Sequence, residues 1–300
     1  MRGFLELTIK YTIMKTFSAR TRRLKAIKKN RLLWVGITIM TLFIIVALFA
    51  PLIARPQGRD PYQLPRDWGH ILAKPGTENH ILGTDSRGSD IFYGLIWGTR
   101  ISLEYGLLIC LLQTVLGTIV GLTSGYYGRW VDSVLMRLTD MFLPLPRLIL
   151  AMALAAAFGI SMTSIAMALI LTGWTRPARI VRSAVVDIKN KQFIESARSI
   201  AASNTRIMVT YLLPNCLAPL LVQATMDLGT IILSISSLAF IGLAPSGIAE
   251  WGAMIAVAQD KLIGGYWWPA FFPGAAIYLF VMGANLVGDG LRDALDPSLY

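Results

Sequence analysis

Residues 187–214 read DIKNKQFIESARSIAASNTRIMVTYLLP and form a polar, basic segment between two long apolar stretches of the chain. Apolar residues recur in its first half at helical spacing, at Phe193, Ala197 and Ile200, and a second apolar run closes the segment. Between the two runs, Ser203-Asn204 offers turn residues and an N-cap for the second one. The pattern predicts two short helices that meet at an angle, as a knob outside the membrane.

The sequence around this knob has the composition of a membrane protein. Apolar residues make up 55% of the 300 residues and charged residues only 15%, against roughly 25% charged in a typical soluble protein. The mean hydropathy is +0.58, so the chain has more apolar surface than one soluble core of this size would bury. This composition excludes a soluble enzyme, a disulfide-rich secreted scaffold and a disordered chain.

Several apolar stretches are long enough to cross a bilayer, which needs roughly 20 helical residues. We predict spans at about residues 32–54, 101–128, 140–159, 162–183, 217–241 and 267–288. The third and fourth are the least obvious, because residues 148–175 carry no charge and only a turn near Gly159 would divide them. Before the fifth span, Pro214 and Pro219 are expected to break the helix and leave a separate surface helix ahead of it.

The distribution of basic residues decides between one span and two in this uncharged stretch. The chain carries a net charge of +11, of which +9 lies in residues 1–31. With that tail in the cytoplasm, two spans place the next basic segment inside as well, as the positive-inside rule prefers. The seven basic residues of that segment are Arg176, Arg179, Arg182, Lys189, Lys191, Arg198 and Arg206. The basic charge is therefore a marker of topology rather than a sign of nucleic-acid binding.

The predicted fold is an all-α, polytopic membrane protein with six transmembrane helices and both termini in the cytoplasm. Its parts are a basic cytoplasmic N-terminal tail at 1–31, a first transmembrane helix at 32–54, an extracytoplasmic loop at 55–98, a core of five transmembrane helices at 99–289 with the cytoplasmic loop 187–214, and a cytoplasmic C-terminal tail at 290–300.

A few polar residues fall inside the predicted spans, where they face a cavity or a partner helix rather than lipid. Gln223 and Asp227 are four residues apart, hence on one helix face. Together with Asn285 they are candidates for the wall of a translocation pathway, and interhelical hydrogen bonds are the alternative for all three. Gly117 and Gly121 are spaced for close helix approach, although this pattern is weak in a glycine-rich membrane chain.

We predict no catalytic residues and no metal site. The sequence contains no Gly-x-x-x-x-Gly-Lys-Ser/Thr phosphate loop and no nucleophile–base constellation. Its two histidines, His70 and His80, lie ten residues apart in the polar outer loop, and a zinc site needs more ligands than that, so we expect solvated loop histidines. Energy for any transport must therefore come from another polypeptide.

The knob resembles the cytoplasmic loop of permease subunits of bacterial ABC importers, which carries a Glu-Ala-Ala motif, a later glycine and a closing Leu-Pro. The corresponding residues are Glu195-Ser196-Ala197, Ala201-Ala202-Ser203-Asn204 and Leu213-Pro214. More specifically, the chain is similar to the C-type permease of the dipeptide, oligopeptide and nickel branch, which also includes glutathione importers. The similarity extends from residue 32 to the C-terminus and includes the blocks 82–91, 100–103, 237–243, 250–254 and 285–297.

The resemblance implies a type I ABC importer permease fold, in which the knob is a coupling helix that fits a groove of an ATP-hydrolysing subunit. The residues that it assigns to this coupling loop are Phe193, Ile194, Glu195, Ser196, Ala197, Arg198, Ser199, Ala201, Ser203 and Asn204. Two of them depart from the motif, because Ser196 replaces alanine and Ala201 replaces glycine. Since alanine at positive φ costs about 1 kcal/mol, we expect the turn to shift towards Ser203-Asn204.

The resemblance also implies the partners of the chain. They are a second homologous permease subunit, two cytosolic ATPase subunits that hold the ATP and Mg, an extracytoplasmic solute-binding protein that meets the 55–98 and 244–266 loops, and membrane lipid. The chain itself would bind no cofactor and would lie in the cell (inner) membrane. The expected cargo is di- or oligopeptides, with nickel chelates or glutathione as alternatives; a membrane-embedded enzyme or a secondary carrier is the alternative of another class.

Overall fold

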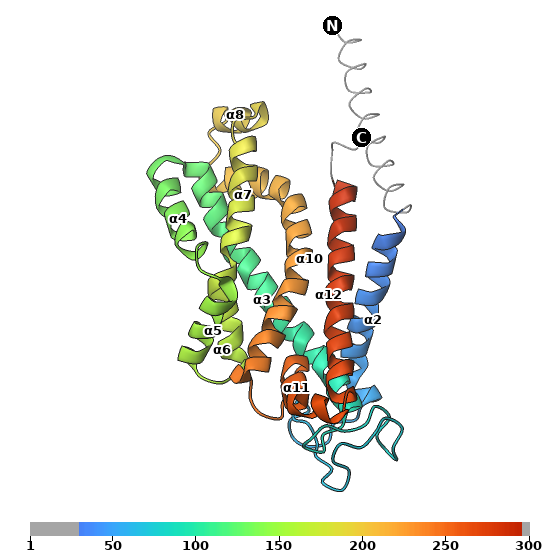
Figure 1. Cartoon of the computed structure of the whole chain (residues 1–300). Helices are drawn as coiled ribbons and strands as arrows, with labels where there is room; N and C mark the ends of the chain where they lie inside the picture. The colour runs from blue at the N-terminus through green and yellow to red at the C-terminus, as the bar shows by residue number, and fades with distance from the viewer. Residues whose placement is uncertain (1–29, 296–300) are drawn as a thin grey trace.

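A computed structural model describes residues 30–295 of the chain. All regular secondary structure in this range is helical, and no β-strand occurs in it. The long helices run side by side in one bundle (Figure 1). Most of the predicted basic tail and the last five residues lie outside the described range, so their placement stays a prediction.

Four of the predicted spans correspond to long, apolar, continuous helices that could each cross a membrane. They are α2 (Arg31–Ile53), α3 (Ile91–Tyr127), the helix Asn204–Leu243, whose middle part is α10 (Leu213–Leu238), and α12 (Trp268–Leu295). The structure thus confirms an all-α membrane protein with multiple spans.

The third and fourth predicted spans are each divided into two helices. The third, predicted at 140–159, covers α5 (Arg147–Phe158) and only the end of α4 (Arg129–Phe142), a helix that the sequence did not predict and that is bent by 86° relative to α5. Pro144 and Pro146 lie at this bend and prevent a continuous helix because proline lacks the amide donor and restricts the residue before it.

The fourth corresponds to α6 (Met162–Gly173) and α7 (Thr175–Ile188), which follow each other across Trp174. The predicted turn between the third and fourth spans is confirmed. Gly159 has φ 95°, and the Ser161 side chain caps α6 by accepting from the Ser164 amide at 3.0 Å. The described structure thus has four continuous candidate spans, or five if α4 and α5 together form one broken span, so the predicted count of six is approximate.

Two predicted boundaries were wrong. The outer loop ends at Asp90 rather than at residue 98, because the Asp90 carboxylate caps α3 by accepting from the Tyr93 amide at 2.7 Å. At the other end of the chain, α12 continues to Leu295, six residues into the predicted C-terminal tail. Its last turn carries Arg292, a cation that is favourable at a helix C-terminus.

The prediction that Pro214 and Pro219 break the helix before the fifth span was also wrong. The chain stays helical from Asn204 past both prolines to the end of α10 at Leu238, and a π-helical segment, Ile207–Leu212, precedes the first proline. Pro214 lies in the first turn of α10, where its missing amide is tolerated. The Asn215 side chain donates to the Tyr211 carbonyl at 2.6 Å.

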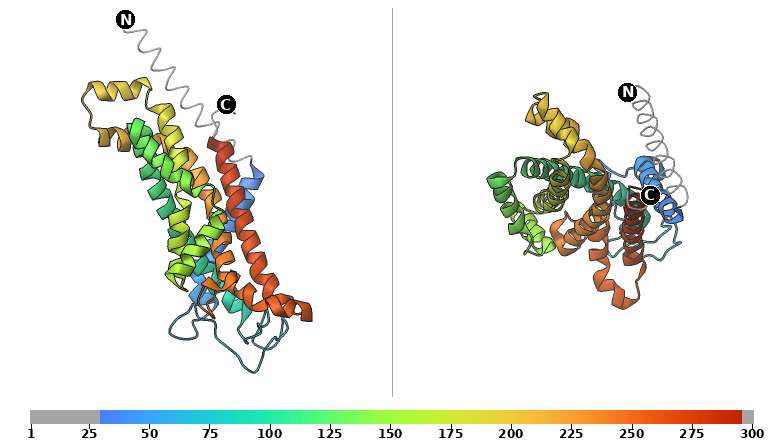
Figure 2. Two further views of the ribbon diagram at one scale, coloured as in Figure 1. Left: turned by 60° about the vertical axis from the view of Figure 1, so that its left-hand side comes forward. Right: turned by 90° about the horizontal axis from the view of Figure 1, so that it is seen from above.

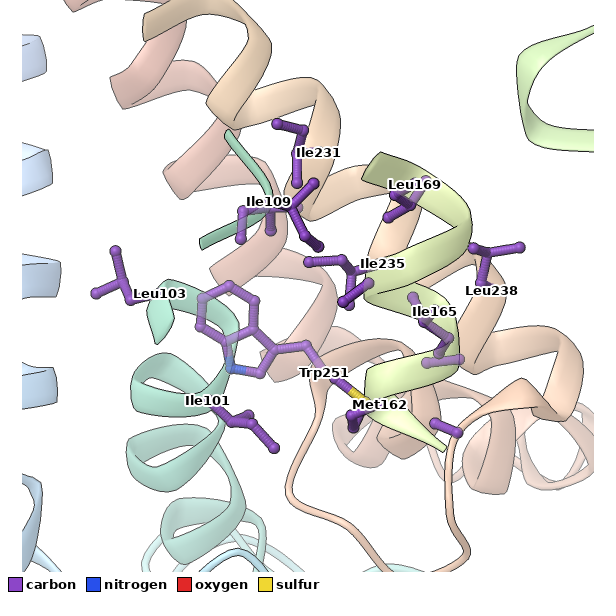
Figure 3. Packing of buried hydrophobic residues seen from close by; sticks show 14 of the residues in the cluster. Ile101, Leu103, Ile109, Met162, Ile165, Leu169, Ile231, Ile235, Leu238 and Trp251 are labelled. Atoms are coloured by element: carbon purple, nitrogen blue, oxygen red, sulfur yellow. The ribbon is translucent and has the colours of Figure 1, made fainter. Parts of the chain in front are cut away.

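The main core lies where α3, α6 and α10 meet near the outer end of the bundle, together with Trp251 from the short helix α11 (Trp251–Ala258) (Figure 3). Labelled in the figure around Trp251 are Ile101, Leu103 and Ile109 of α3, Met162, Ile165 and Leu169 of α6, and Ile231, Ile235 and Leu238 of α10. This core fixes the three helices relative to one another.

The two loop regions lie at opposite ends of the bundle (Figures 1 and 2). Helix α8 (Gln192–Ser199) lies at one end, together with the start of α2 and the end of α12. The outer loop and the segment 244–249 lie at the other end and pack on each other, since the Leu64 amide donates to the Gly247 carbonyl at 2.8 Å and Ala249 to Tyr62 at 2.7 Å. This arrangement agrees with the predicted topology.

Candidate functional site

Helix α8 projects sideways beyond the ends of the long helices (Figure 2). Its inner face is formed by Ile194 and Ala197, which are 0% and 3% exposed. They pack in a second hydrophobic cluster with Val185 of α7 and with Ile207 and Leu212 of the next helix. The predicted knob is therefore attached to two membrane helices at once.

The outer face of α8 makes few contacts in the described part of the chain. Its exposed residues are Gln192, Phe193, Glu195, Ser196, Arg198 and Ser199, and the C-cap residue Ile200 is exposed as well. Ile200 is 72% exposed and Phe193 41%, beside the charges of Glu195 and Arg198. Large apolar side chains on a projecting, charged element are typical of a surface that another protein covers.

The turn after α8 lies at Ala201, so the predicted shift towards Ser203-Asn204 was wrong. Ala201 adopts φ 56°, and its amide donates to the Arg198 carbonyl at 2.9 Å. The Ala202 amide donates to the Ala197 carbonyl at 3.1 Å, which completes a Schellman motif. These hydrogen bonds hold an alanine where glycine is the unstrained residue.

The predicted cap of the next helix is confirmed. The Ser203 hydroxyl accepts from the Arg206 amide at 3.4 Å. Asn204 has a second role, because its side-chain oxygen accepts from the Tyr126 hydroxyl at 2.7 Å and so ties the knob to the end of α3.

We expect Ala201→Gly to stabilise the protein by about 1 kcal/mol, because glycine adopts positive φ without steric cost. Thermal melting of the purified protein in detergent would measure the change. Ala202→Gly is the matched control, since Ala202 is not among the positive-φ residues and glycine there is expected to give no stabilisation. A lower melting temperature for Ala201→Gly would contradict the strain that we assign to this turn.

A polar cluster lies within the bundle, between α7 and α10. The Asp227 side chain is buried and accepts from the Gln223 side-chain amide at 2.9 Å, as their predicted common face requires. Arg176 of α7 donates to the same carboxylate oxygen at 3.4 Å. Both an interhelical contact and a pathway wall are therefore compatible with these two residues.

The cluster continues through Arg147 and Gln113. The Arg147 guanidinium donates to the Gln113 side-chain oxygen at 3.4 Å, and the Gln113 amide donates to the Leu169 carbonyl at 2.7 Å. The Nε atom of Arg147 is buried and has no hydrogen-bond partner in the described structure. A cavity of about 430 Å³ is lined by Arg147, Arg176 and Arg179.

The sequence did not single out these arginines as site residues. In the sequence, the basic residues served only as markers of topology. Nothing in their spacing shows that Arg147 and Arg176 lie close to Asp227. Asn285, in contrast, is exposed on α12 and makes no side-chain hydrogen bond that the described structure records. The structure does not bring it into the cluster, and its place in the pathway stays a prediction.

The class of protein follows from comparison with protein families. Residues 115–299 match the family described as binding-protein-dependent transport system inner membrane component, and residues 20–75 match the N-terminal TM domain of oligopeptide transport permease C. The chain belongs to this family of multi-pass transport permeases, which confirms the predicted resemblance to ABC importer permeases.

Within the family, the chain belongs to the dipeptide and oligopeptide branch. It is 40% identical over 276 residues to the dipeptide transport system permease protein DppC of Alkalihalophilus pseudofirmus, covering 92% of this chain and 88% of that protein. It is 38% identical to the di/tripeptide transport system permease protein DppC of Pseudomonas aeruginosa, covering 88% and 87%. It is 35% identical to the oligopeptide transport system permease protein OppC of Bacillus subtilis, covering 91% and 87%.

Proposed function

We propose that this chain is one permease half of an ATP-driven importer of di- or oligopeptides, and that α8 couples it to the ATPase subunits. The observation that carries this proposal is the exposed face of α8, which combines Phe193 and Ile200 with Glu195 and Arg198 at the end opposite the outer loop. ATP and Mg belong to two cytosolic ATPase subunits. A second, homologous permease completes the pathway in the inner membrane, with both termini of this chain in the cytoplasm.

The coupling mechanism follows from what α8 is attached to. Because Ile194 and Ala197 pack against α7 and the helix Asn204–Leu243, a displacement of α8 moves these two helices together. The same helices hold Arg176 and Asp227 in the polar cluster. Closure of the ATPase subunits would thus rearrange the middle of the bundle and alternate access to it.

The polar cluster supports a peptide as the cargo. A peptide carries a carboxylate at one end and an ammonium group at the other. Arg147 and Arg176 present guanidinium groups that suit a carboxylate, since their donors match its two oxygens. Asp227 supplies the opposite charge nearby. At the outer end, the packed 55–90 and 244–249 segments form the surface that a solute-binding protein would meet.

The test is uptake of a labelled dipeptide by the complete complex in proteoliposomes, with ATP hydrolysis measured in parallel. Phe193→Ala combined with Glu195→Lys is expected to lower uptake about 30-fold, the scale of a lost interface hot spot. The fold should be retained, because both side chains are exposed. Ser199→Ala on the same face is the control and should transport normally.

Unchanged uptake by the double variant, with the ATPase subunits still bound, would overturn the coupling role of α8. The choice of peptide as cargo would be overturned if unlabelled glutathione or a nickel chelate inhibited uptake of the labelled dipeptide more strongly than unlabelled dipeptide does.

A further inference from the structure

Three side chains with metal-ligand atoms meet in the outer loop, although the sequence predicts only solvated histidines there. They are Asp67, His70 and His80, and their ligand atoms all lie within 4.8 Å of one another. The Asp67 Oδ2 atom lies 2.9 Å from His70 Nδ1 and 3.4 Å from His80 Nε2. The prediction that both histidines are solvated was wrong for His80, which is buried, and correct for His70, which is exposed.

These separations suit a shared transition-metal ion. Ligand atoms bound tetrahedrally to Zn²⁺ at about 2.0–2.1 Å stand roughly 3.3 Å apart. Two imidazole nitrogens and one carboxylate oxygen form a donor set that zinc commonly takes in proteins. The three atoms therefore need only small adjustments to enclose one ion.

The buried histidine is held in the orientation that metal binding requires. Asp90 Oδ2 lies 2.6 Å from His80 Nδ1, which leaves Nε2 directed at Asp67. A carboxylate on the far nitrogen of a ligating histidine is the usual outer partner in zinc sites. Asp90 is itself fixed, because its other oxygen caps α3.

As in Asp90, the two carboxylate oxygens of Asp67 have different partners. Its Oδ1 accepts from the Gly69 amide at 2.9 Å, while Oδ2 faces both histidines. The Gly69 amide thus orients the carboxylate so that Oδ2 is directed at the two histidines. The loop backbone supports this position, since the Asp67 amide donates to the Gly88 carbonyl at 2.8 Å.

A cavity of about 450 Å³ adjoins the cluster and is lined in part by Asp67, His80 and Asp90. It gives an ion access and leaves room for a fourth ligand, such as water. We propose that Asp67, His70 and His80 bind one Zn²⁺ ion, with Asp90 as the positioning residue. Such an ion joins the segment 67–70 to His80 and, through Asp90, to the first turn of α3.

The test is a titration of the full-length protein, purified in detergent without a histidine tag and treated with EDTA, with Zn²⁺ alone against a chromophoric chelator. Wild type is expected to bind one equivalent. His80→Gln and His70→Ala should each weaken binding at least tenfold, and Asp90→Asn about tenfold, as expected for an outer partner. Glu78→Gln, in the same loop but outside the cluster, is the matched control.

Folding of each variant is checked by thermal melting without metal, and Zn²⁺ should raise the melting temperature of wild type but not of His70→Ala. This variant alters an exposed side chain, so it is expected to fold. Equal zinc affinity of wild type and the two histidine variants, or no binding by wild type, would overturn the proposal. The outcome is independent of the uptake assay, because it needs neither cargo nor ATPase subunits.

Discussion

Replacing Gly121 by leucine is expected to separate α3 from α7 and to leave little folded protein. Gly117, Gly121 and Gly125 follow one another at four-residue spacing along one face of α3. A Cβ atom on Gly117 would lie 2.6 Å from the Trp174 carbonyl oxygen. On Gly121 it would lie 2.8 Å from Val181 Cβ, and on Gly125 it would lie 2.8 Å from Val185 Cβ. The two helices therefore pack with their backbones close together, and a side chain at Gly121 has no space.

The expected loss is at least about 3 kcal/mol, the upper end of the usual cost of overpacking, because the obstacle is helix backbone that cannot yield. Thermal melting and size-exclusion chromatography of the purified protein would measure it. Gly274→Leu is the matched control, because a Cβ atom there has no neighbour within 4 Å. Similar melting temperatures for the two variants would contradict the close packing of α3 on α7.

Asp227→Leu is expected to lower dipeptide uptake about tenfold or more. The substitution removes the acceptor of both Gln223 and Arg176, and leaving a charged group without its partner costs roughly 1.5–3 kcal/mol. It also removes the negative charge that partners Arg176, one of the arginines that line the cavity. Uptake is measured per folded complex, so that a loss of expression is not mistaken for a loss of transport.

Two variants separate charge from shape at this position. Asp227→Glu keeps the carboxylate and should restore part of the uptake. Thr230→Ala, on the exposed side of the same helix about one turn away, should leave uptake unchanged. Wild-type uptake by folded Asp227→Leu would show that the cluster has no part in the pathway.

The membrane-spanning segments and the coupling loop could be predicted because their signals are local. A run of apolar residues identifies α2 or α12 by itself, and the basic residues before α8 predict on which side of the membrane it lies. The motif around Glu195 could be recognised without knowing which residues lie close to it in space. The prolines were misleading for the opposite reason, because Pro214 lies in the first turn of α10, after a π-helical segment, where its missing amide is tolerated.

Ala201 shows how tertiary structure overrides a local preference. Its intrinsic cost at positive φ predicts a displaced turn, yet the Schellman hydrogen bonds and the burial of Ala197 hold the turn in place. The glycine face of α3 shows the reverse case. A weak sequence pattern at Gly117 and Gly121 proves to be a close helix contact once α7 lies against it.

By itself, the sequence determined the class of protein, its approximate spans and the position of the projecting helix α8, because hydrophobicity, charge and motif are properties of contiguous residues. Only the tertiary structure decided which distant residues meet. Arg176 lies 51 positions from Asp227, and His80 lies 13 from Asp67. Such contacts depend on how helices pack and how a loop without repeating pattern folds back on itself, and no periodicity along the chain encodes either.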